Sequence, residues 1–323
     1  LKKLQLIIQL MKNKPIIIVA GEPKSIFFEI FFKSLKSEKY KSPLIIIASI
    51  KILESQMKKF NVKKKIKIIN FKNFDNFKLD NRSINLLNVN LEGQDESKYI
   101  KDSFNLAFKI LKKRFTDKFI NGPINKSKFL NKKFLGITEY ISKKFKTKNS
   151  AMLIYNKNLS VCPITTHLPL KLVPNKIDKK LIINKTVLIN NFFIEHIGFK
   201  PKIAIVGLNP HCESILRFNE DTGIVTPAIK YLKKNRYKVS GPFSADTMFL
   251  KQNRSKYNVI IGMYHDQVLT PMKTIAEYDA VNITLGLPFL RISPDHGPNE
   301  SMFNKNLSNP LSLIQAIKFL DKR

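Results

Sequence analysis

Short, continuous apolar runs alternate along this chain with stretches of helical spacing, and this alternation constrains the fold more than any other feature. Runs such as PIIIVA at 15–20 and KIAIVGL at 202–208 are typical of buried strands. The stretch 96–114 instead repeats its apolar residues with the period of a helix. Strands that alternate with helices predict an α/β fold with a largely parallel sheet, in which ligands bind beyond the carboxyl ends of the strands.

The remaining elements are predicted in the same way. We expect strands at 15–20, 43–49, 65–71, 115–120, 151–156, 159–166, 202–208 and 257–264, and helices at 26–36, 96–114, 179–198 and 312–322. The runs 151–156 and 159–166 are predicted to pair with each other. The Lys- and Asn-rich region 72–92 is predicted to be the loosest part of the chain.

Charge and composition argue against several classes of partner. The formal net charge is +33, but only seven of the 57 basic residues are Arg, and the Lys residues are spread along the chain. This uniform skew is typical of an AT-rich coding sequence, whereas a nucleic-acid-binding surface more often combines clustered Arg with aromatic side chains. No run approaches the ~20 apolar residues of a membrane-spanning helix. We therefore expect neither a nucleic-acid nor a membrane partner.

The cysteines and the first residues bear on localisation. Cys162 and Cys212 do not make a disulfide framework. The apolar stretch within residues 1–10 is short and lacks a signal-peptide cleavage site. If translation starts at Met11, these residues are an extension. The chain is expected to be cytoplasmic.

Three of the five histidines directly follow predicted strands: His167 in TTHLP, His211 in LNPHC and His265 in MYHDQ. For a single loop histidine, a structural hydrogen bond would be the better interpretation. Three at strand ends are expected to converge at one edge of the sheet, and three imidazoles with an open fourth position suit a catalytic zinc. His196 lies on the predicted helix 179–198 and is expected to be structural.

Two acidic residues are placed to support such a site. Asp266 follows His265 directly, and a metal-ligating histidine usually donates its second N–H to a carboxylate or carbonyl. Asp246 lies in GPFSADTMF and is a candidate for proton transfer. The alternative for Asp246 is that it caps the helix expected to begin at TMF.

A second polar group follows downstream and consists of Lys273, Asn282 and Arg291. Arg291 is one of few arginines in a Lys-rich chain, and its planar fork suits bidentate binding of phosphate or carboxylate. The alternative is an ordinary surface ion pair. NGPINKS at 121–127 is another strand-end loop, where Lys126 is a candidate for contacting an anion. The chain has no GxGxxG and no Walker-type glycine loop.

Taken in order, these motifs resemble one enzyme family. GEP, NGPINKS, GITEY, TTHLPL, GLNPH, GPFSADT, MYHDQ, VNITLGLPFLR and SPDHG make the chain similar to the 4-hydroxythreonine-4-phosphate dehydrogenases of vitamin B6 biosynthesis, from about Pro15 to the C-terminal helix. The resemblance implies a two-domain α/β/α, isocitrate-dehydrogenase-like fold. Its first domain would be 11–136 plus 297–323, and its second domain, 137–296, would carry most metal and substrate residues.

The resemblance also implies a homodimeric, metal-dependent, NAD-linked oxidoreductase. Such enzymes oxidise the C3 hydroxyl of 4-phosphooxy-L-threonine, and the resulting β-keto acid loses carbon dioxide to give 3-amino-2-oxopropyl phosphate, in pyridoxal phosphate biosynthesis. The active site would lie at the dimer interface, with ligands from both chains. Zinc is the expected metal, with magnesium or cobalt as alternatives. The implied metal ligands are His167, His211 and His265; the implied substrate-binding residues are Thr138, Lys273, Asn282 and Arg291; the candidate bases are Asp246, Asp266 and Lys273.

Departures from the family pattern keep other functions open. Ile137 stands where the GHTE motif of the family has His, so one substrate hydrogen bond is lost or replaced. Ser25 and Phe27 replace two glycines of the opening loop, and CESILRF replaces the glycine-rich segment after LNPH. A sister dehydrogenase acting on erythronate or threonate 4-phosphate is therefore an alternative. A zinc hydrolase and a non-catalytic anion-binding protein are more remote alternatives.

Overall fold

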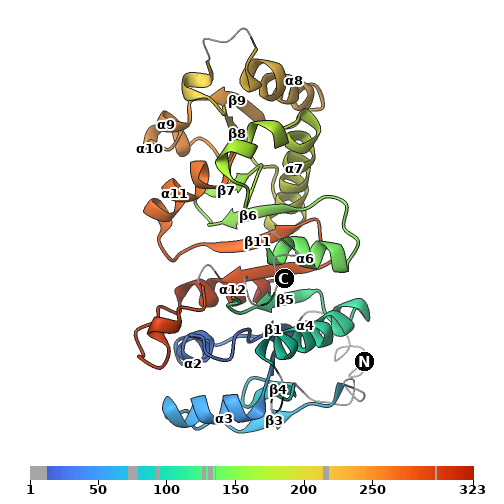
Figure 1. The fold of residues 1–323 in the computed structure, drawn as a ribbon, viewed down its shortest axis with the longest axis vertical. Coiled ribbons are helices and arrows are strands. Elements are labelled where there is room, and N and C mark those ends of the chain that lie inside the picture. The colour runs from blue at the N-terminus through green and yellow to red at the C-terminus, as the bar shows by residue number, and fades with distance from the viewer. Residues whose placement is uncertain are drawn as a thin grey trace. The chain divides into compact units, whose positions relative to one another are not determined.

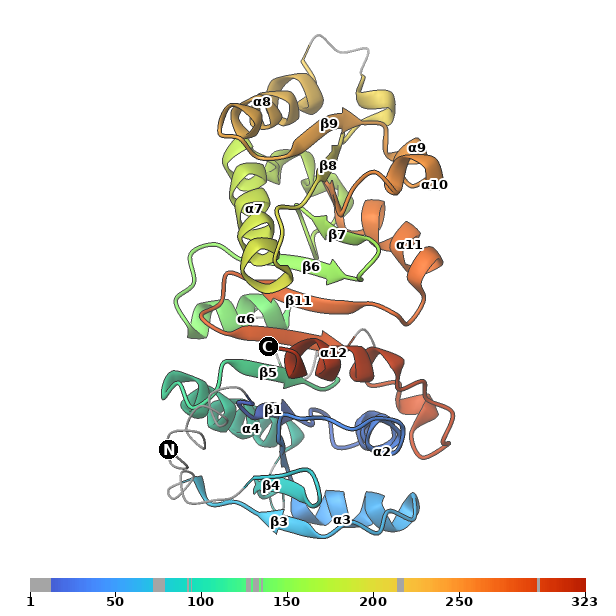
Figure 2. The same cartoon turned by 180° about the vertical axis from the view of Figure 1, so that it is seen from behind.

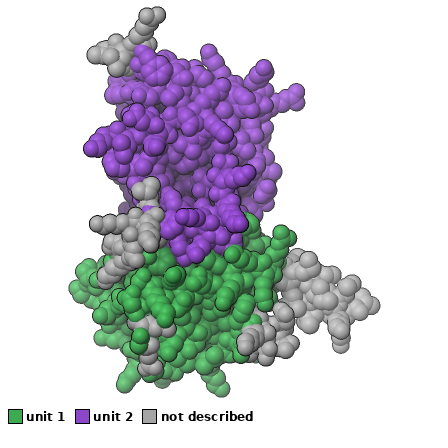
Figure 3. All heavy atoms as spheres, turned by 45° about the vertical axis from the view of Figure 1, so that its right-hand side comes forward, with its two compact units in different colours: residues 1–132, 288–323 green, residues 133–287 purple. Residues whose placement is uncertain are grey.

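The computed structural model divides into two compact units, which Figure 3 shows in different colours. Unit 1 comprises residues 1–132 and 288–323, and unit 2 comprises residues 133–287. The described residues are 13–71, 79–91, 93, 95–125, 129, 134, 136–213, 218–294 and 297–323. The chain returns to unit 1 at Pro288, ahead of residue 297, where the sequence-based boundary stands.

Unit 1 contains a parallel sheet with the strand order β3-β4-β2-β1-β5-β12. Its strands are β1 (Ile16–Val19), β2 (Leu44–Ala48), β3 (Ile66–Ile68), β4 (Ile84–Asn88), β5 (Lys118–Asn121) and β12 (Leu290–Pro294), and its helices are α2 (Phe27–Ser37), α3 (Ile50–Lys59), α4 (Glu96–Lys112) and α12 (Leu311–Asp321). In Figures 1 and 2, α4 lies on one face of this sheet and α2 and α12 lie on the other. Covered on both faces, β1 and β2 are continuous apolar runs without polar alternation.

Strand β4 corrects one sequence-based expectation. It lies inside the region 72–92, predicted to be the loosest part of the chain, yet Ile84–Leu87 are buried between β3 and β2. The Lys- and Asn-rich composition of this region suggested a loop, and the strand itself contains a polar residue, Asn85. The side chain is buried, and its Nδ2 donates to Leu44 O at 3.0 Å and to Asp80 O at 2.7 Å. Residues 72–78 lie outside the described residues.

Unit 2 contains a mixed sheet with the strand order β11-β6-β7-β10-β8-β9. The pairs β11–β6 and β6–β7 are antiparallel, which confirms the predicted pairing of 151–156 with 159–166, and the pairs β7–β10, β10–β8 and β8–β9 are parallel. The strands are β6 (Ala151–Tyr155), β7 (Ser160–Pro163), β8 (Ile203–Val206), β9 (Val239–Phe243), β10 (Val259–Gly262) and β11 (Val281–Leu285), and the helices are α6 (Ile137–Lys144), α7 (Lys179–Phe192), α8 (Thr226–Lys234), α9 (Ala245–Met248), α10 (Lys251–Arg254) and α11 (His265–Ala276). The largely parallel α/β fold is thus confirmed.

The helices of unit 2 enclose the parallel part of its sheet. Helices α7 and α8 lie on one face, and α9, α10 and α11 lie on the other (Figures 1 and 2). Side chains from β6, β7, β8 and β10 pack with Met248 of α9 and with Val268 and Met272 of α11 in one buried cluster. This packing leaves the carboxyl ends of β7, β8 and β10 to carry the loops with the candidate site residues. No helix in the described part of the chain is long and apolar enough to cross a bilayer.

Candidate active site

The parallel neighbours β7 and β10 bring two of the predicted histidines together. Pro163 and Gly262 are register partners, and the pairing continues past both strands, because Thr165 N donates to Met263 O at 3.1 Å. His167 lies four residues after Pro163, and His265 lies three residues after Gly262. Their ring centroids lie 5.8 Å apart, with an angle of 38° between the ring planes. Of the three histidines expected to converge, these two do.

The segment MYHDQ begins helix α11 rather than ending a strand. The predicted strand 257–264 ends at Gly262, and His265 is the first residue of the helix. Asp266 lies in the first turn, with Oδ1 2.6 Å from His265 Nδ1. Gln267, which sequence reasoning did not single out, accepts from Met263 N at 2.7 Å and donates to Gly207 O at 2.8 Å. Gln267 thereby joins the ends of β10 and β8.

His211 lies in a tight turn after β8. His211 and Cys212 both have left-handed backbone conformations, with φ of 55° and 60°. The turn is organised by Asp221, a fully buried residue whose carboxylate accepts from Leu208 N at 2.6 Å and from Asn209 N at 2.9 Å. Asn209 Nδ2 donates to the same carboxylate at 3.0 Å. Sequence reasoning missed Asp221, because backbone N–H groups as partners leave no trace in the sequence.

The histidines fit a metal site only in part. Among the residues that the structure describes, no three His, Cys, Asp or Glu side chains are grouped so that they could hold one metal ion. His167 and His265 are close enough to act together, whereas His211 is exposed and does not join them. The donor chemistry suits zinc. One folded chain therefore supplies two of the three expected ligands at one place.

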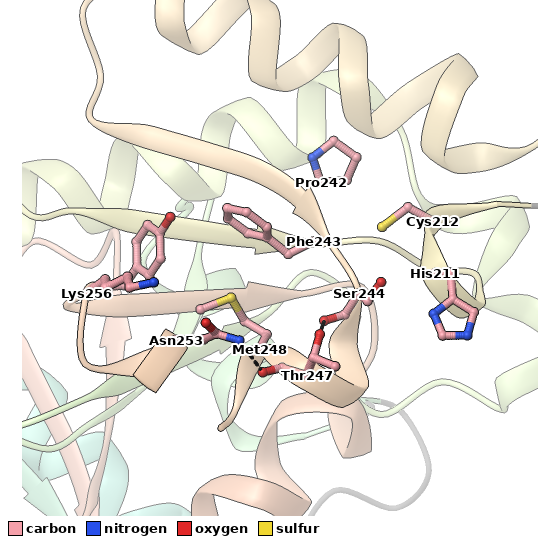
Figure 4. A pocket seen from close by; sticks show the side chains of 10 residues that line it. His211, Cys212, Pro242, Phe243, Ser244, Thr247, Met248, Asn253 and Lys256 are labelled. Atoms are coloured by element: carbon pink, nitrogen blue, oxygen red, sulfur yellow. Dashed lines mark hydrogen bonds between the residues drawn. The ribbon is translucent and has the colours of Figure 1, made fainter. Parts of the chain in front are cut away.

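A cavity of about 360 Å³ lies beside the His211 turn. Figure 4 shows the side chains of His211 and Cys212 on one side of it and those of Asn253 and Lys256 on the other. Asn253 Nδ2 donates to Thr247 O at 2.9 Å, which ties α10 to α9. Burial raises the pKa of the Cys212 thiol, and the nearby Asp221 carboxylate adds to this.

Asp246 lies close by in sequence but does not line this cavity. It is exposed inside helix α9, whose N-cap residue is Ser244. The alternative interpretation of Asp246 as a helix cap is therefore wrong, because the helix begins at Ala245, two residues earlier than TMF suggested.

Two of the implied substrate-binding residues lie on the same side of strand β11. Thr138 Oγ1, from α6, lies 3.5 Å from Thr284 Oγ1. Asn282 is two residues before Thr284 and so faces the same side of the sheet. Its Oδ1 is buried and has no hydrogen-bond partner among the described residues. Lys273 is exposed in α11. Thr138 and Asn282 thus form one polar patch of unit 2.

Arg291 belongs to unit 1 and is buried there. It lies on β12 with an exposed fraction of 0%, and its Nε donates to Asn121 Oδ1 at 2.8 Å. The alternative of a surface ion pair is therefore wrong. Asn121 ends β5 and opens the NGPINKS loop, whose Lys126 lies outside the described residues.

The first strand-to-helix turn of unit 1 is closed by a contact between two loops. Gly21 has φ of 85°, and a Cβ there would collide with Pro123 O. Glu22 N donates to the same carbonyl at 2.9 Å. The glycine therefore allows close packing of two loops and offers no open cradle for a pyrophosphate at this turn.

Comparisons with known proteins agree with this fold. Residues 39–320 match the family described as "Pyridoxal phosphate biosynthetic protein PdxA". A 4-hydroxythreonine-4-phosphate dehydrogenase of Sulfurihydrogenibium sp. is 39% identical over 315 residues, which cover 93% of this chain and 95% of the relative. The crystal structure of a 4-hydroxythreonine-4-phosphate dehydrogenase from Klebsiella pneumoniae has a TM-score of 0.80 at 26% identity and covers 95% of this chain and 98% of that chain.

A more distant likeness concerns the fold alone. A β-decarboxylating dehydrogenase of Thermococcus kodakarensis is similar, with a TM-score of 0.51 at 11% identity, covering 95% of this chain and 82% of that chain. The expected fold class is thus confirmed, and so is an oxidoreductase in place of the hydrolase and anion-binding alternatives. The chain belongs to the PdxA family, the 4-hydroxythreonine-4-phosphate dehydrogenases, which are oxidoreductases of pyridoxal phosphate biosynthesis.

Proposed function

We propose that this chain oxidises the C3 hydroxyl of 4-phosphooxy-L-threonine with NAD as the acceptor. A hydride leaves C3 for NAD, and the hydroxyl proton passes to a base. The resulting β-keto acid releases its carboxylate as carbon dioxide, and a proton returns to the carbon to give 3-amino-2-oxopropyl phosphate. The observation that carries the proposal is the side-by-side placement of His167 and His265 at adjacent strand ends, in a chain of this family.

The metal would be held by His167 and His265 of one chain and by His211 of a second copy. A dimer accounts for two facts at once: the first two imidazoles are paired, and His211 is exposed on a rigid turn beside a cavity. Three imidazoles favour zinc over magnesium, which prefers oxygen ligands. When bound, the ion supplies a Lewis acid that lowers the pKa of the substrate hydroxyl.

The substrate would be held by one neutral and one cationic set of side chains. The buried Asn282 Oδ1 lacks a donor among the described residues and suits the ammonium or hydroxyl group of the substrate, and Thr138 lies on the same side of β11. Lys273 and Arg291 supply positive charge for the phosphate and carboxylate. Arg291 belongs to unit 1, and the other three residues belong to unit 2.

The candidates for the base differ in their present contacts. Asp266 Oδ1 is already 2.6 Å from His265 Nδ1, which suits it for orienting that ring. Lys273 and Asp246 are both exposed, on α11 and α9. We assign ring orientation to Asp266, and Lys273 and Asp246 remain the two candidates for taking the hydroxyl proton.

The first experiment is an NADH-formation assay with 4-phosphooxy-L-threonine, compared with erythronate and threonate 4-phosphates. Turnover that prefers the amino acid, is lost with a chelator and returns with zinc is expected. Ile137 makes the two sugar-acid phosphates the proper competitors, since it replaces the hydrogen-bonding residue of the family pattern. Preference for a sugar-acid phosphate would replace the proposed substrate, and no NADH with any of them would overturn the proposal.

A second experiment tests the shared metal site by mixing two inactive variants. His167→Gln and His211→Gln are each expected to lose activity and tight zinc binding. A mixed dimer has one site that lacks both ligands and one that lacks neither, if His211 comes from the second copy. Co-refolding should therefore restore activity and zinc binding in one of the two sites. No restoration in a verified mixed dimer would place all three ligands in one chain.

A further inference from the structure

Glu139 in the first turn of α6 directs its carboxylate toward His167. A Cβ at Gly136 would stand 2.7 Å from Glu139 Oε2 and 3.1 Å from both Nδ1 and Cε1 of His167. The carboxylate and this edge of the ring therefore border the same small volume, which only glycine leaves open. Glu139 Oε2 is buried and has no hydrogen-bond partner among the described residues. A buried carboxylate oxygen in this state is short of a donor.

Two neighbouring side chains act on Glu139, one through a hydrogen bond and one through its charge. Thr166, the residue before His167, donates from Oγ1 to Glu139 Oε1 at 3.4 Å. Lys185 of α7 is 8% exposed, and its Nζ donates to Pro163 O at 3.3 Å. Burial lowers the pKa of Lys185, while Cys162 and the Glu139 carboxylate act in the opposite direction. Glu139 thus lies near enough to Lys185 for the two side chains to interact through their charges.

We propose that Glu139 is a positioning residue that accepts a hydrogen bond from Nδ1–H of His167 and so leaves Nε2 of that ring for the metal. This inference rests on the metal-dependent function proposed above. Metal-ligating histidines usually donate their second ring N–H to a carboxylate or carbonyl, which selects the tautomer and the ring orientation. Asp266 already occupies that position at His265. Each of the paired imidazoles then has its own carboxylate.

The tautomer of His167 in the metal-free protein gives the most direct test. Long-range ¹H–¹⁵N NMR distinguishes the two ring nitrogens, and only five histidines have to be assigned. The measurement is made at mildly alkaline pH, where an imidazole is ordinarily neutral, and we expect the proton of His167 to be on Nδ1. In Glu139→Ala the proton should shift toward Nε2. A matched control is Glu195→Ala, whose exposed carboxylate lies 3.9 Å from Nε2 of His196, outside the site.

Zinc affinity, measured by competition with a chelator, is the second readout. Glu139→Ala should bind zinc about 10- to 100-fold more weakly, and Glu195→Ala should bind it like the wild type. Gly136→Ala keeps both partners but inserts a methyl group between them, and its φ of −164° suits alanine. It should weaken zinc binding as well, and it keeps the proposal testable if Glu139→Ala does not fold.

Two results would overturn the role of Glu139. One is a wild-type His167 with its proton on Nε2, and the other is an unchanged zinc affinity in both Glu139→Ala and Gly136→Ala. Wild-type protein that binds no zinc would instead remove the metal-dependent function. The tautomer comparison in metal-free protein would still decide whether Glu139 orients His167, so the two failures are distinguishable.

Discussion

The turn that carries His211 and the turn that carries His265 follow neighbouring parallel strands, but different forces hold them. In the His211 turn, the fully buried Asp221 accepts three N–H donors from the residues just before the histidine. In the His265 turn, Asp266 contacts the imidazole itself and is 79% exposed. One carboxylate fixes the backbone and the other orients a ring.

The two turns therefore contribute differently: the His211 turn contributes to the stability of the fold, and the His265 turn contributes to the chemistry of the site. The left-handed backbone at His211 and Cys212 costs on the order of 1 kcal/mol for each residue, and the hydrogen bonds to Asp221 offset that cost. At His265 the backbone is the ordinary first turn of a helix and needs no such support. Substitutions in the His211 turn should therefore lower the stability of the fold, and substitutions in the His265 turn should weaken ligand binding.

The largest effect is expected for Asp221→Asn. The amide cannot accept all three N–H groups and turns its own N–H donors toward them, so the free energy of unfolding should fall by about 3 kcal/mol. Urea denaturation of the metal-free protein measures this. Asp178→Asn is the matched control, because this exposed helix cap accepts one N–H, from Leu181 at 2.7 Å. Asn caps a helix about as well as Asp, so this substitution should cost less than about 0.5 kcal/mol. Equal losses in the two variants would contradict the distinction.

Asp266→Asn should show the opposite pattern. Because the side chain is exposed, the free energy of unfolding should change by less than about 0.5 kcal/mol. Zinc affinity should fall by about tenfold, since the ring of His265 loses the carboxylate that orients it. Glu277→Gln, at the other end of α11, removes the same charge and should leave zinc affinity unchanged. A large loss of stability without a loss of affinity would reverse the assignment.

The smallest effect concerns the two thiols. Burial raises the pKa of Cys162 to about 11 and also raises the pKa of the half-buried Cys212. Little thiolate is therefore present at neutral pH. Iodoacetamide should label Cys212 slowly, and faster as the pH rises, while Cys162 should react only after unfolding. Peptide mass spectrometry separates the two sites. Labelling of Cys212 should be faster in Asp221→Asn, and an unchanged rate would mean that the turn survives without its carboxylate.

A pH titration of stability follows from the same thiol. The pKa of Cys162 is higher in the folded chain than in the unfolded chain, so folding favours the protonated form. Its contribution to stability is complete below the unfolded value of about 9 and is lost as the pH rises toward about 11. In Cys162→Ala this part of the alkaline decline should disappear.

The sequence was most informative where burial shapes the residue pattern. Continuous apolar runs marked the central strands, and the parallel arrangement then predicted that His167 and His265 would meet. Strands with polar residues were missed: β4 contains the buried Asn85, and β11 contains Asn282 and Thr284. Asn85 contacts Leu44 and Thr284 contacts Thr138, both far away in the sequence, so alternation alone did not reveal these strands.

The site residues also fall into those that the sequence could identify and those that it could not. Side chains with recognisable chemistry, such as the strand-end histidines, could be named from the sequence. Asp221, Gln267 and Glu139 could not, because their partners are backbone groups or side chains of other elements. The burial of Arg291 was equally hidden, since its partner Asn121 is 170 residues away along the chain.

The burial of Arg291 also restricts which basic residue can occupy this position. A single base change converts some arginine codons into lysine codons, and most basic positions here are Lys. Burial lowers the pKa of both Lys118 and Lys185, so a lysine in the dry interior tends to lose its charge. A guanidinium keeps its proton and its fork geometry there. Replacement of Arg291 by lysine is thus disfavoured, because desolvation would lower the pKa of a lysine at this position.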